Sequence, residues 1–406
     1  MLLYWIWFAQ LNKLSTAQKN LLLQHFYDPE EIYHCRLSAL AKLEGVTEAM
    51  CNALEDKDLT AAEKILQQCD ELGIGIVTQQ DETYPARLKN TYDPPIILYF
   101  KGTLPQWDAQ PVIAIVGTRK ATPYGLTVAG RFGKQIAASG ALVVSGAAFG
   151  IDTYAMQGAL QAGKPVVGVL GCGVDQVYPK SNKELFNDIL QKGCLLSEYP
   201  PKSQAMSWHF PERNRIVTGI SNGVLVVEAP EKSGAMISAR HAIEQGRDVF
   251  AVPGNVDVPS CAGSNALLQD RAIPALSGWD VVKEYAQHWP DVVKRQNVEY
   301  HTPQEQMQKV AQTVCLPANI QNTEENSRKK DIDKDRESTY SVLNEQLPPL
   351  CDDEKAVLSL IGKEPIGVDE VIAGANMTPG AVKAVLTKLA IKRLTVSHPG
   401  GRVSLK

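Results

Sequence analysis

Three glycine-containing segments each follow an apolar run, a combination suited to binding phosphate. The runs Ile113–Val116, Ala141–Val144 and Val224–Val227 are followed by segments that begin Gly117-Thr118-Arg119, Ser145-Gly146 and, a few residues further on, Ser233-Gly234. Glycine loops let backbone N–H groups come close to an anion, and a following helix start adds partial positive charge. At Ser233, plain helix capping by the hydroxyl competes with this interpretation. The pattern predicts phosphate binding and leaves open whether the phosphate belongs to a free nucleotide or to a nucleic acid.

The segment Phe210–Arg215 places an aromatic ring close to two guanidinium groups. Aromatic rings stack on nucleobases and guanidinium groups bind phosphate, so the segment is suited to gripping a nucleic-acid strand. The alternative is structural. Arg213 or Arg215 would then be paired in the interior with Glu198 or Glu228, because buried arginines need partners. The sequence leaves both interpretations open.

The motifs of common nucleotide-dependent enzymes are absent from the sequence. It contains neither the GxGxxG dinucleotide fingerprint nor the GxxxxGK[ST] phosphate loop. His209 and His241 belong to no Ser/His/Asp or metal-binding pattern, and the eight cysteines form no CxxC pair. We therefore predict a protein that is not an enzyme and that uses no cofactor and no metal.

The composition restricts where a nucleic-acid site can lie. The chain has 406 residues, of which 44% are hydrophobic and 21% charged, enough for two or three domains. Its formal net charge is -4, so any such site must be a local basic patch. The apolar start, Met1–Ala9, is too short to span a bilayer and predicts a buried helix. Together with the unpaired cysteines, it predicts a cytoplasmic protein that contacts no membrane.

Between residues 111 and 285, short apolar runs alternate with segments of helix length. The runs that predict strands are Ile113–Val116, Leu142–Val144, Val166–Leu170, Cys194–Ser197, Val224–Val227 and Val249–Val252. Continuous runs of Val, Ile and Leu predict an α/β fold: a Rossmann-like, mainly parallel sheet with helices on both faces. Ligands of such sheets bind beyond the carboxyl ends of the strands, where the polar segments described above stand.

Changes in composition and hydrophobic periodicity along the chain predict four regions. Residues 1–72 have helical periodicity and predict a helical domain resembling SAM or helix-hairpin-helix domains. Residues 73–287 predict the Rossmann-like domain with its lead-in strands. Residues 288–348 include a charged, nearly apolar-free stretch at 321–341, which predicts a flexible linker. Residues 349–406 predict three helices and a hairpin, the pattern of a winged helix.

Both terminal regions carry weak signals for DNA binding. The Leu43–Thr47 turn resembles the glycine turn of a helix-hairpin-helix unit, but one such turn is a weak signal and favours an ordinary helix-helix turn. The third helix expected in the C-terminal region, Pro379–Ala390 with the residues just after it, carries Lys383, Lys388, Lys392 and Arg393. Acidic residues earlier in that region nearly cancel this charge, so a protein-interaction role remains an alternative to DNA binding.

The ordered set of short motifs resembles the DprA/Smf family of DNA-processing proteins. The motifs are Gly117-Thr-Arg119, Ser145-Gly146-xxx-Gly150-Ile-Asp152, Gly171-x-Gly173-x4-Tyr178-Pro179-xx-Asn182, Leu196-Ser-Glu198-Tyr-Pro200, Phe210-Pro-x-Arg213-Asn-Arg215, Val227-Glu228-Ala, Ser233-Gly234 and Pro253-Gly254. Each motif is unspecific alone, whereas their order and spacing are highly specific. The resemblance spans roughly residues 80–280, and the helical and winged-helix regions look like the domains that flank this core in many family members.

The resemblance implies a cytoplasmic homodimer that binds single-stranded DNA, protects incoming DNA during natural transformation and loads the RecA recombinase onto it. It also implies that Arg119 and Phe210–Arg215 line the DNA pocket, with the Ser145 loop beside them. The predicted DNA-binding residues are therefore Gly117, Thr118, Arg119, Ser145, Gly146, Phe210, Arg213, Asn214, Arg215, Ser233 and Gly234.

The sequence departs from the family pattern at three places. Met156 stands where a histidine is expected after Gly-Ile-Asp, and a methionine cannot transfer protons or bind hard metals. Ser145–Ala148 is Ser-Gly-Ala-Ala instead of the frequent Ser-Gly-Leu-Ala, a change that affects packing more than phosphate contact. An early Gly-x-Gly turn is missing at Leu11–Ser15, which puts DNA binding by the N-terminal region in doubt.

Two other functions compete with DNA binding. One is a Rossmann-type nucleotide hydrolase or phosphoribohydrolase, but such enzymes carry a Pro-Gly-Gly-x-Gly-Thr loop followed by a glutamate, and Pro253-Gly254-Asn255 breaks that pattern. The other is a scaffold protein for which contact with DNA is incidental.

Overall fold

A computed structural model describes residues 1–297 and, between 352 and 405, all residues except 363, 376, 380, 383–384, 387–388, 390–393 and 399–401. These residues belong to two compact units, one within 1–297 and one within 352–405, and each is described by itself. The linker predicted at 321–341 and the cationic side chains Lys383, Lys388, Lys392 and Arg393 lie outside the described residues.

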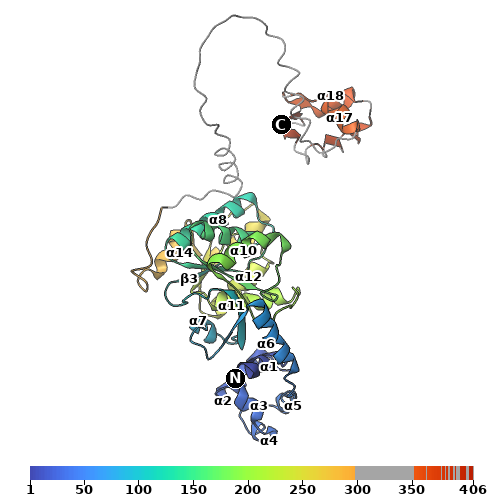
Figure 1. The fold of residues 1–406 in the computed structure, drawn as a ribbon. Coiled ribbons are helices and arrows are strands. Elements are labelled where there is room, and N and C mark those ends of the chain that lie inside the picture. The colour runs from blue at the N-terminus through green and yellow to red at the C-terminus, as the bar shows by residue number, and fades with distance from the viewer. Residues whose placement is uncertain are drawn as a thin grey trace, which may run out of the picture. The chain divides into compact units, whose positions relative to one another are not determined.

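Six helices, α1 to α6, form the N-terminal part of the first unit (Figure 1). They are α1 Leu2–Gln10, α2 Thr16–His25, α3 Pro29–His34, α4 Leu37–Leu40, α5 Glu48–Ala53 and α6 Thr60–Leu72. The apolar start of the chain is buried as expected, because Trp5–Phe8 lie in the core. The helices begin at polar caps: Ser15 and Gln18 form a capping box at α2, and Thr47 caps α5. Gly45 supplies the positive φ of the turn before α5.

A nine-stranded sheet forms the centre of the first unit. Its strands are β1 Gly75–Thr78, β2 Ile97–Gly102, β3 Val112–Val116, β4 Leu142–Ser145, β5 Val166–Leu170, β6 Cys194–Ser197, β7 Gly223–Val226, β8 Asp248–Ala251 and β9 Ile273–Pro274. Their order is β1-β2-β6-β5-β4-β3-β7-β8-β9. In this sheet order, every neighbouring pair of strands from β6 through β3 to β9 is parallel. The pairs β1–β2 and β2–β6 are antiparallel and form one edge of the sheet. The six predicted strands are confirmed, with β7 and β8 displaced by one residue toward the N-terminus.

Helices cover both faces of the sheet, as the continuous apolar strands predict. The helices and 3-10 turns are α7 Ala86–Lys89, α8 Pro123–Ala138, α9 Ile151–Gln161, η1 Lys180–Asn182, α10 Lys183–Lys192, α11 His209–Gly219, α12 Gly234–Glu244, η2 Pro259–Cys261, α13 Ala262–Gln269, α14 Gly278–Val282 and η3 Lys283–Tyr285. Ile113 and Ile115 of β3 pack in one apolar cluster with residues of α8, α9 and α14, while Ala114 and Val116 pack in the other with α11 and α12. The N-terminal helices share the first of these clusters.

The strand order changes direction beside β3. From β3 the chain moves outward through β4, β5 and β6, and then returns to place β7 on the other side of β3. The loops that leave the carboxyl ends of β3 and β7 therefore turn to opposite faces of the sheet and leave a crevice between them. The fold thus defines one preferred ligand position before any side chain is considered.

The second unit has the elements of a winged helix. It contains α17 Asp352–Leu358, α18 Val368–Gly374 and a small sheet of β10 Ile366–Gly367, β11 Thr395–His398 and β12 Arg402–Leu405 in the order β10-β12-β11. The described residues of the third predicted helix, among them Val382, Val385 and Leu389, are helical and pack in the core with Val371 and Val403. The predicted hairpin is confirmed by the antiparallel pairing of β11 and β12.

Candidate functional site

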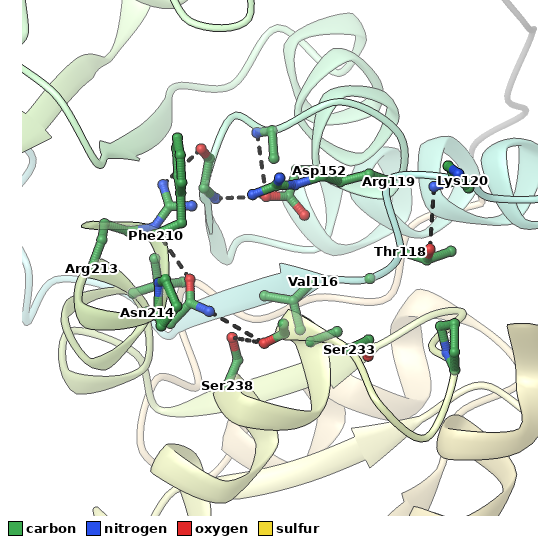
Figure 2. A pocket seen from close by; sticks show the side chains of 18 of the residues that line it. Val116, Thr118, Arg119, Lys120, Asp152, Phe210, Arg213, Asn214, Ser233 and Ser238 are labelled. Carbon is green, nitrogen blue, oxygen red and sulfur yellow. Dashed lines mark hydrogen bonds between the residues drawn. The ribbon is translucent and has the colours of Figure 1, made fainter. Parts of the chain in front are cut away.

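A cavity of about 820 Å³ opens at the point where the strand order reverses (Figure 2). Its walls come from five segments, with residues from Val116–Lys120, Gly146–Asp152, Phe210–Val217, Pro230–Ser238 and Pro259–Ser260, together with Tyr178, Ala205 and Ser207. We call it the switch-point cavity. Nine of the eleven predicted residues line it, and Ser145 and Arg215 do not.

The segment after β3 carries the exposed cations Arg119 and Lys120. The backbone N–H of Thr118 donates to the Glu228 carbonyl over 2.7 Å, and the N–H of Lys120 donates to the Thr118 hydroxyl over 3.2 Å. These bonds fix the loop directly beyond the strand end. The Arg119 guanidinium carbon lies 5.0 Å from the centre of the Phe210 ring, a cation–π distance that holds the charge at the cavity.

Glu228 holds the loop after β3 in place. Its carboxylate is buried and accepts hydrogen bonds from the Thr122 N–H, from the Thr122 hydroxyl over 2.8 Å and from the Ser260 hydroxyl. Thr122 caps α8 with the same hydroxyl, which accepts from the Gly125 N–H. The Glu228 oxygens are therefore already occupied by protein donors, which is typical of a structural carboxylate.

Asp152 organises the loop after β4. Its buried carboxylate accepts from the Gly146 N–H over 3.1 Å and from the Ala148 N–H over 3.4 Å. Burial raises the pKa of Asp152, and the charge of Arg213 and these N–H donors oppose that rise. The Ser145 hydroxyl donates to the Ile115 carbonyl over 2.6 Å inside the sheet. Ser145 thus stabilises the two strand ends and does not face the cavity.

Arg213 is buried, with an exposed fraction of 3%, although part of it borders the cavity. Its Nη1 donates to the carbonyls of Gly146, over 2.7 Å, and Val169. A Cβ added at Gly146 would collide with Arg213 and Asp152, so an alanine here would displace these two buried side chains. Arg213 therefore stabilises the loop after β4, and most of its N–H donors already bind acceptors within the protein.

The start of α12 faces the cavity from the other side of the crevice. The Ser233 hydroxyl accepts from the Met236 N–H over 3.4 Å, so the capping role is confirmed. Asn214 donates to the Gly234 carbonyl over 3.2 Å and ties α11 to α12. A Cβ added at Gly234 would meet only the Asn214 side chain, 4.0 Å away, so the protein itself leaves the space above Gly234 open. The early N–H groups of a helix lack intrahelical acceptors and attract anions.

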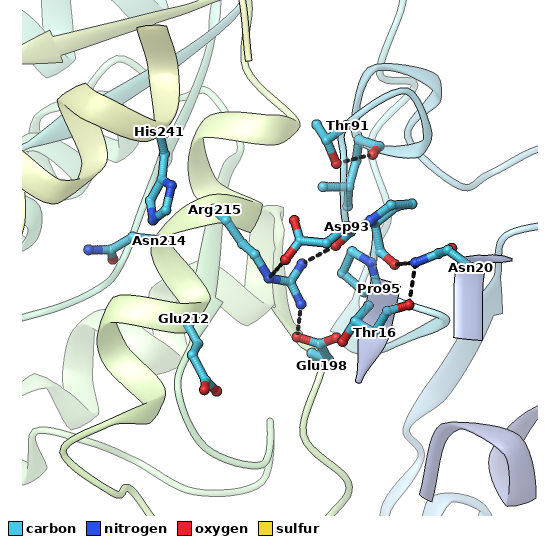
Figure 3. A network of polar contacts seen from close by, with 12 residues as sticks. Thr16, Asn20, Thr91, Asp93, Pro95, Glu198, Glu212, Asn214, Arg215 and His241 are labelled. Atoms are coloured by element: carbon cyan, nitrogen blue, oxygen red, sulfur yellow. Dashed lines mark hydrogen bonds and ion pairs between the residues drawn. The ribbon is translucent and has the colours of Figure 1, made fainter. Parts of the chain in front are cut away.

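Arg215 lies on another side of α11 (Figure 3). Its guanidinium pairs with Glu198 over 2.6 Å and with Asp93 over 3.3 Å, and it donates to the Asp93 carbonyl over 2.8 Å. Only 9% of Arg215 is exposed. The paired interpretation of the sequence is therefore right for Arg215, and the partner is Glu198. The neighbouring Pro94 carbonyl accepts from Asn20 of α2, so this network also joins the N-terminal helices to the core.

The electrostatics of the cavity favour an anion. Arg119, Lys120 and Lys232 are exposed at its walls, whereas the carboxylates of Asp152 and Glu228 are buried and hydrogen-bonded. Sequence reasoning missed Lys120, Tyr178 and Lys232. The two lysines are direct neighbours of the predicted residues Arg119 and Ser233, and Tyr178 belongs to one of the motifs already recognised. These positions in the sequence could have identified all three residues. Over the residues that the structure describes, no group of three or more His, Cys, Asp or Glu side chains could hold a metal ion.

Comparison with known proteins identifies the family of this chain. The model of the family described as DNA recombination-mediator protein A matches residues 75–286, and the model of the DprA winged helix domain matches residues 343–401. The chain belongs to the DprA/Smf family. Protein Smf of Synechocystis is 31% identical over 98% of this chain and 97% of its own length. DNA processing protein DprA of Bacillus subtilis is 38% identical over 59% of this chain and 78% of its own.

A solved structure in the DprA/Smf family has the same fold. The X-ray structure of DNA processing protein A from Streptococcus pneumoniae is 33% identical, with a TM-score of 0.60, and the match covers 69% of this chain and 96% of that one. Met156, which replaces the expected family histidine, is fully buried in the core cluster on one face of the sheet. Among the helices described, none is long and apolar enough to cross a membrane.

Proposed function

We propose that this protein binds single-stranded DNA in the switch-point cavity. The observation that carries the proposal is the exposed Arg119, held over Phe210 at the point where the loops after β3 and β7 leave a crevice. Arg119, Lys120 and Lys232 supply positive charge for backbone phosphates, and the start of α12 at Ser233 and Gly234 adds N–H donors.

A single strand suits this cavity better than a duplex. The cations stand beside the aromatic rings of Phe210 and Tyr178 within one concave surface. Single strands present phosphates and the flat faces of unpaired bases together, whereas a duplex hides those faces in its stack. Gly117, Thr118, Gly146 and Asn214 shape the wall. Arg213 supports it, and Ser145 and Arg215 act at a distance from the strand.

We further propose the role of a recombination mediator, in which a cytoplasmic homodimer protects incoming DNA and loads the RecA recombinase onto it during natural transformation. The description of the matching family, DNA recombination-mediator protein A, supports this role. Its test is RecA filament formation on single strands already coated with single-strand-binding protein. Addition of this protein should accelerate filament formation, and an unchanged rate would contradict the mediator role.

The same geometry supports a binding protein over a nucleotide hydrolase. Glu228, a buried carboxylate two residues after β7, accepts hydrogen bonds from Thr122 and Ser260 and holds the loop after β3. The purified protein should therefore release neither base nor phosphate from nucleotides. Hydrolysis that disappears in Glu228→Ala while the variant remains folded would favour the enzyme instead.

Fluorescence anisotropy tests the binding function directly. A labelled single strand, the matching duplex and a labelled mononucleotide are titrated with the full chain at two salt concentrations. We expect the single strand to bind most tightly and its affinity to fall with salt, because phosphate binding releases counterions. Equal or tighter binding of the mononucleotide would contradict the proposal.

A further inference from the structure

Phe149 is a large apolar side chain on the surface, with an exposed fraction of 58%. It lies in the loop between β4 and α9, directly before Gly150, and the core does not cover it. Exposing an aromatic ring forgoes the free energy that burial would provide. A scattered surface aromatic needs no explanation, but this one stands at the edge of the proposed DNA site.

The loop that carries Phe149 is held in a fixed shape. Ala147 has a φ of 50° and Gly150 a φ of 87°, which both lie in the left-handed region. The Ala147 carbonyl accepts from Asn182 over 3.0 Å, and the Ala148 carbonyl accepts from the Thr153 hydroxyl over 2.7 Å. Strained backbone persists where the surroundings enforce it, so the loop presents Phe149 in a defined position.

Phe149 lines a small side cavity next to the switch-point cavity. The two cavities share Arg119, Tyr178 and Phe210 in their walls. Phe210 is already engaged on several sides. Arg119 lies over its ring, the Tyr178 ring centre is 5.3 Å from its own at an angle of 31°, and a Cβ at Gly171 would come within 3.1 Å of it. Tyr178, in contrast, is 44% exposed.

We propose that the side cavity is a nucleobase subsite, in which a base of the bound strand packs against the open rings of Phe149 and Tyr178. This proposal rests on the proposed binding of single-stranded DNA. The phosphate next to that base binds Arg119, which belongs to both cavities, and Phe210 holds the Arg119 side chain in place. Stacking of this kind tolerates every base, because each base has a π face.

Two strands distinguish base stacking from phosphate binding. One is an ordinary oligonucleotide, and the other has the same backbone with abasic residues. Phe149→Ala should weaken binding of the ordinary strand by about 5-fold to 150-fold, the range expected for one stacked base, and leave the abasic strand unchanged. Phe149→Tyr keeps a ring and should restore binding. Tyr92→Ala, at an aromatic residue that is 89% exposed and lines neither cavity, is the matched control.

The outcomes separate this proposal from the function on which it rests. If the wild type binds the ordinary strand but Phe149→Ala binds both strands as the wild type does, the subsite is refuted. An equal loss on both strands also refutes it, because that loss reflects a distorted loop. If the wild type binds neither strand, the proposed function itself fails. An unchanged melting temperature of Phe149→Ala, expected for an exposed side chain, shows that any loss is local.

Discussion

Replacing Arg119 by alanine removes one of the three exposed basic side chains that line the described part of the switch-point cavity. Each phosphate contact on a single strand contributes about 0.7 to the slope of log affinity against log salt. With Arg119, Lys120 and Lys232 all in contact, the wild-type slope is about -2.1. A rise in salt from 50 to 200 mM then weakens binding about 18-fold. Arg119→Ala should reduce the slope to about -1.4 and the loss to about 7-fold.

The affinity itself should also fall, because a hydrogen bond to a charged group is lost, at a cost of about 1.5–3 kcal/mol. Anisotropy titrations over a series of salt concentrations measure both quantities. Arg119→Lys is the matched control, since it keeps the charge and therefore the slope. Arg119 is exposed, so thermal unfolding should not change. A lowered melting temperature with normal DNA binding by the folded fraction would refute this role and make Arg119 a support of the fold.

The two glycines of the cavity should respond differently to alanine. Gly234→Ala should leave the melting temperature unchanged and weaken DNA binding, because the added methyl group enters the open space of the cavity and meets no protein atom closely. Gly146→Ala should lower the free energy of unfolding by about 1–3 kcal/mol through overpacking. The reverse pattern would contradict the geometry. Arg215→Ala should cost about 1–3 kcal/mol of stability, because it removes a buried guanidinium and leaves its half-buried acidic partners unpaired, while the folded fraction still binds DNA with the wild-type salt slope. Lys19 is buried, which lowers its pKa to about 8 from 10.5 when unfolded. Its charged form therefore destabilises the fold at neutral pH, and the wild type should gain about 3 kcal/mol relative to Lys19→Met as the pH rises from 8 to 10.5. A difference in unfolding free energy that stays constant with pH would rule this out.

The core of the fold was predictable because its strands are continuous apolar runs. A parallel sheet buries both faces of each strand, so β3 to β8 stand out in the sequence without any knowledge of the tertiary structure. The antiparallel edge formed by β1 and β2, and the short strand β9, were not predicted as parts of this sheet. The edge formed by β1 and β2 depends on the pairing of β2 with β6, which lies far away in the sequence, and β9 spans only Ile273–Pro274, which is too short to give a strand pattern.

The candidate site was predictable in position but less so in the roles of its residues. Strand ends meet at one edge of a parallel sheet, which brought Gly117, Gly146 and Gly234 to one cavity. The direction of each side chain on a helix was harder to assign. Arg213 and Arg215 are two residues apart on α11, so they point to different sides, one toward the loop after β4 and the other toward Asp93.

Photocrosslinking tests the central claim most directly, because it reports where the strand lies on the full-length protein. A single strand containing photoreactive thymine analogues is bound, irradiated and digested, and the crosslinked peptides are identified by mass spectrometry. Crosslinks should concentrate on peptides that contain Phe149, Tyr178 and Phe210, and they should diminish in Arg119→Ala. Crosslinks confined to residues 1–72 or to residues 352–405 would contradict the assignment of the DNA site to the switch-point cavity.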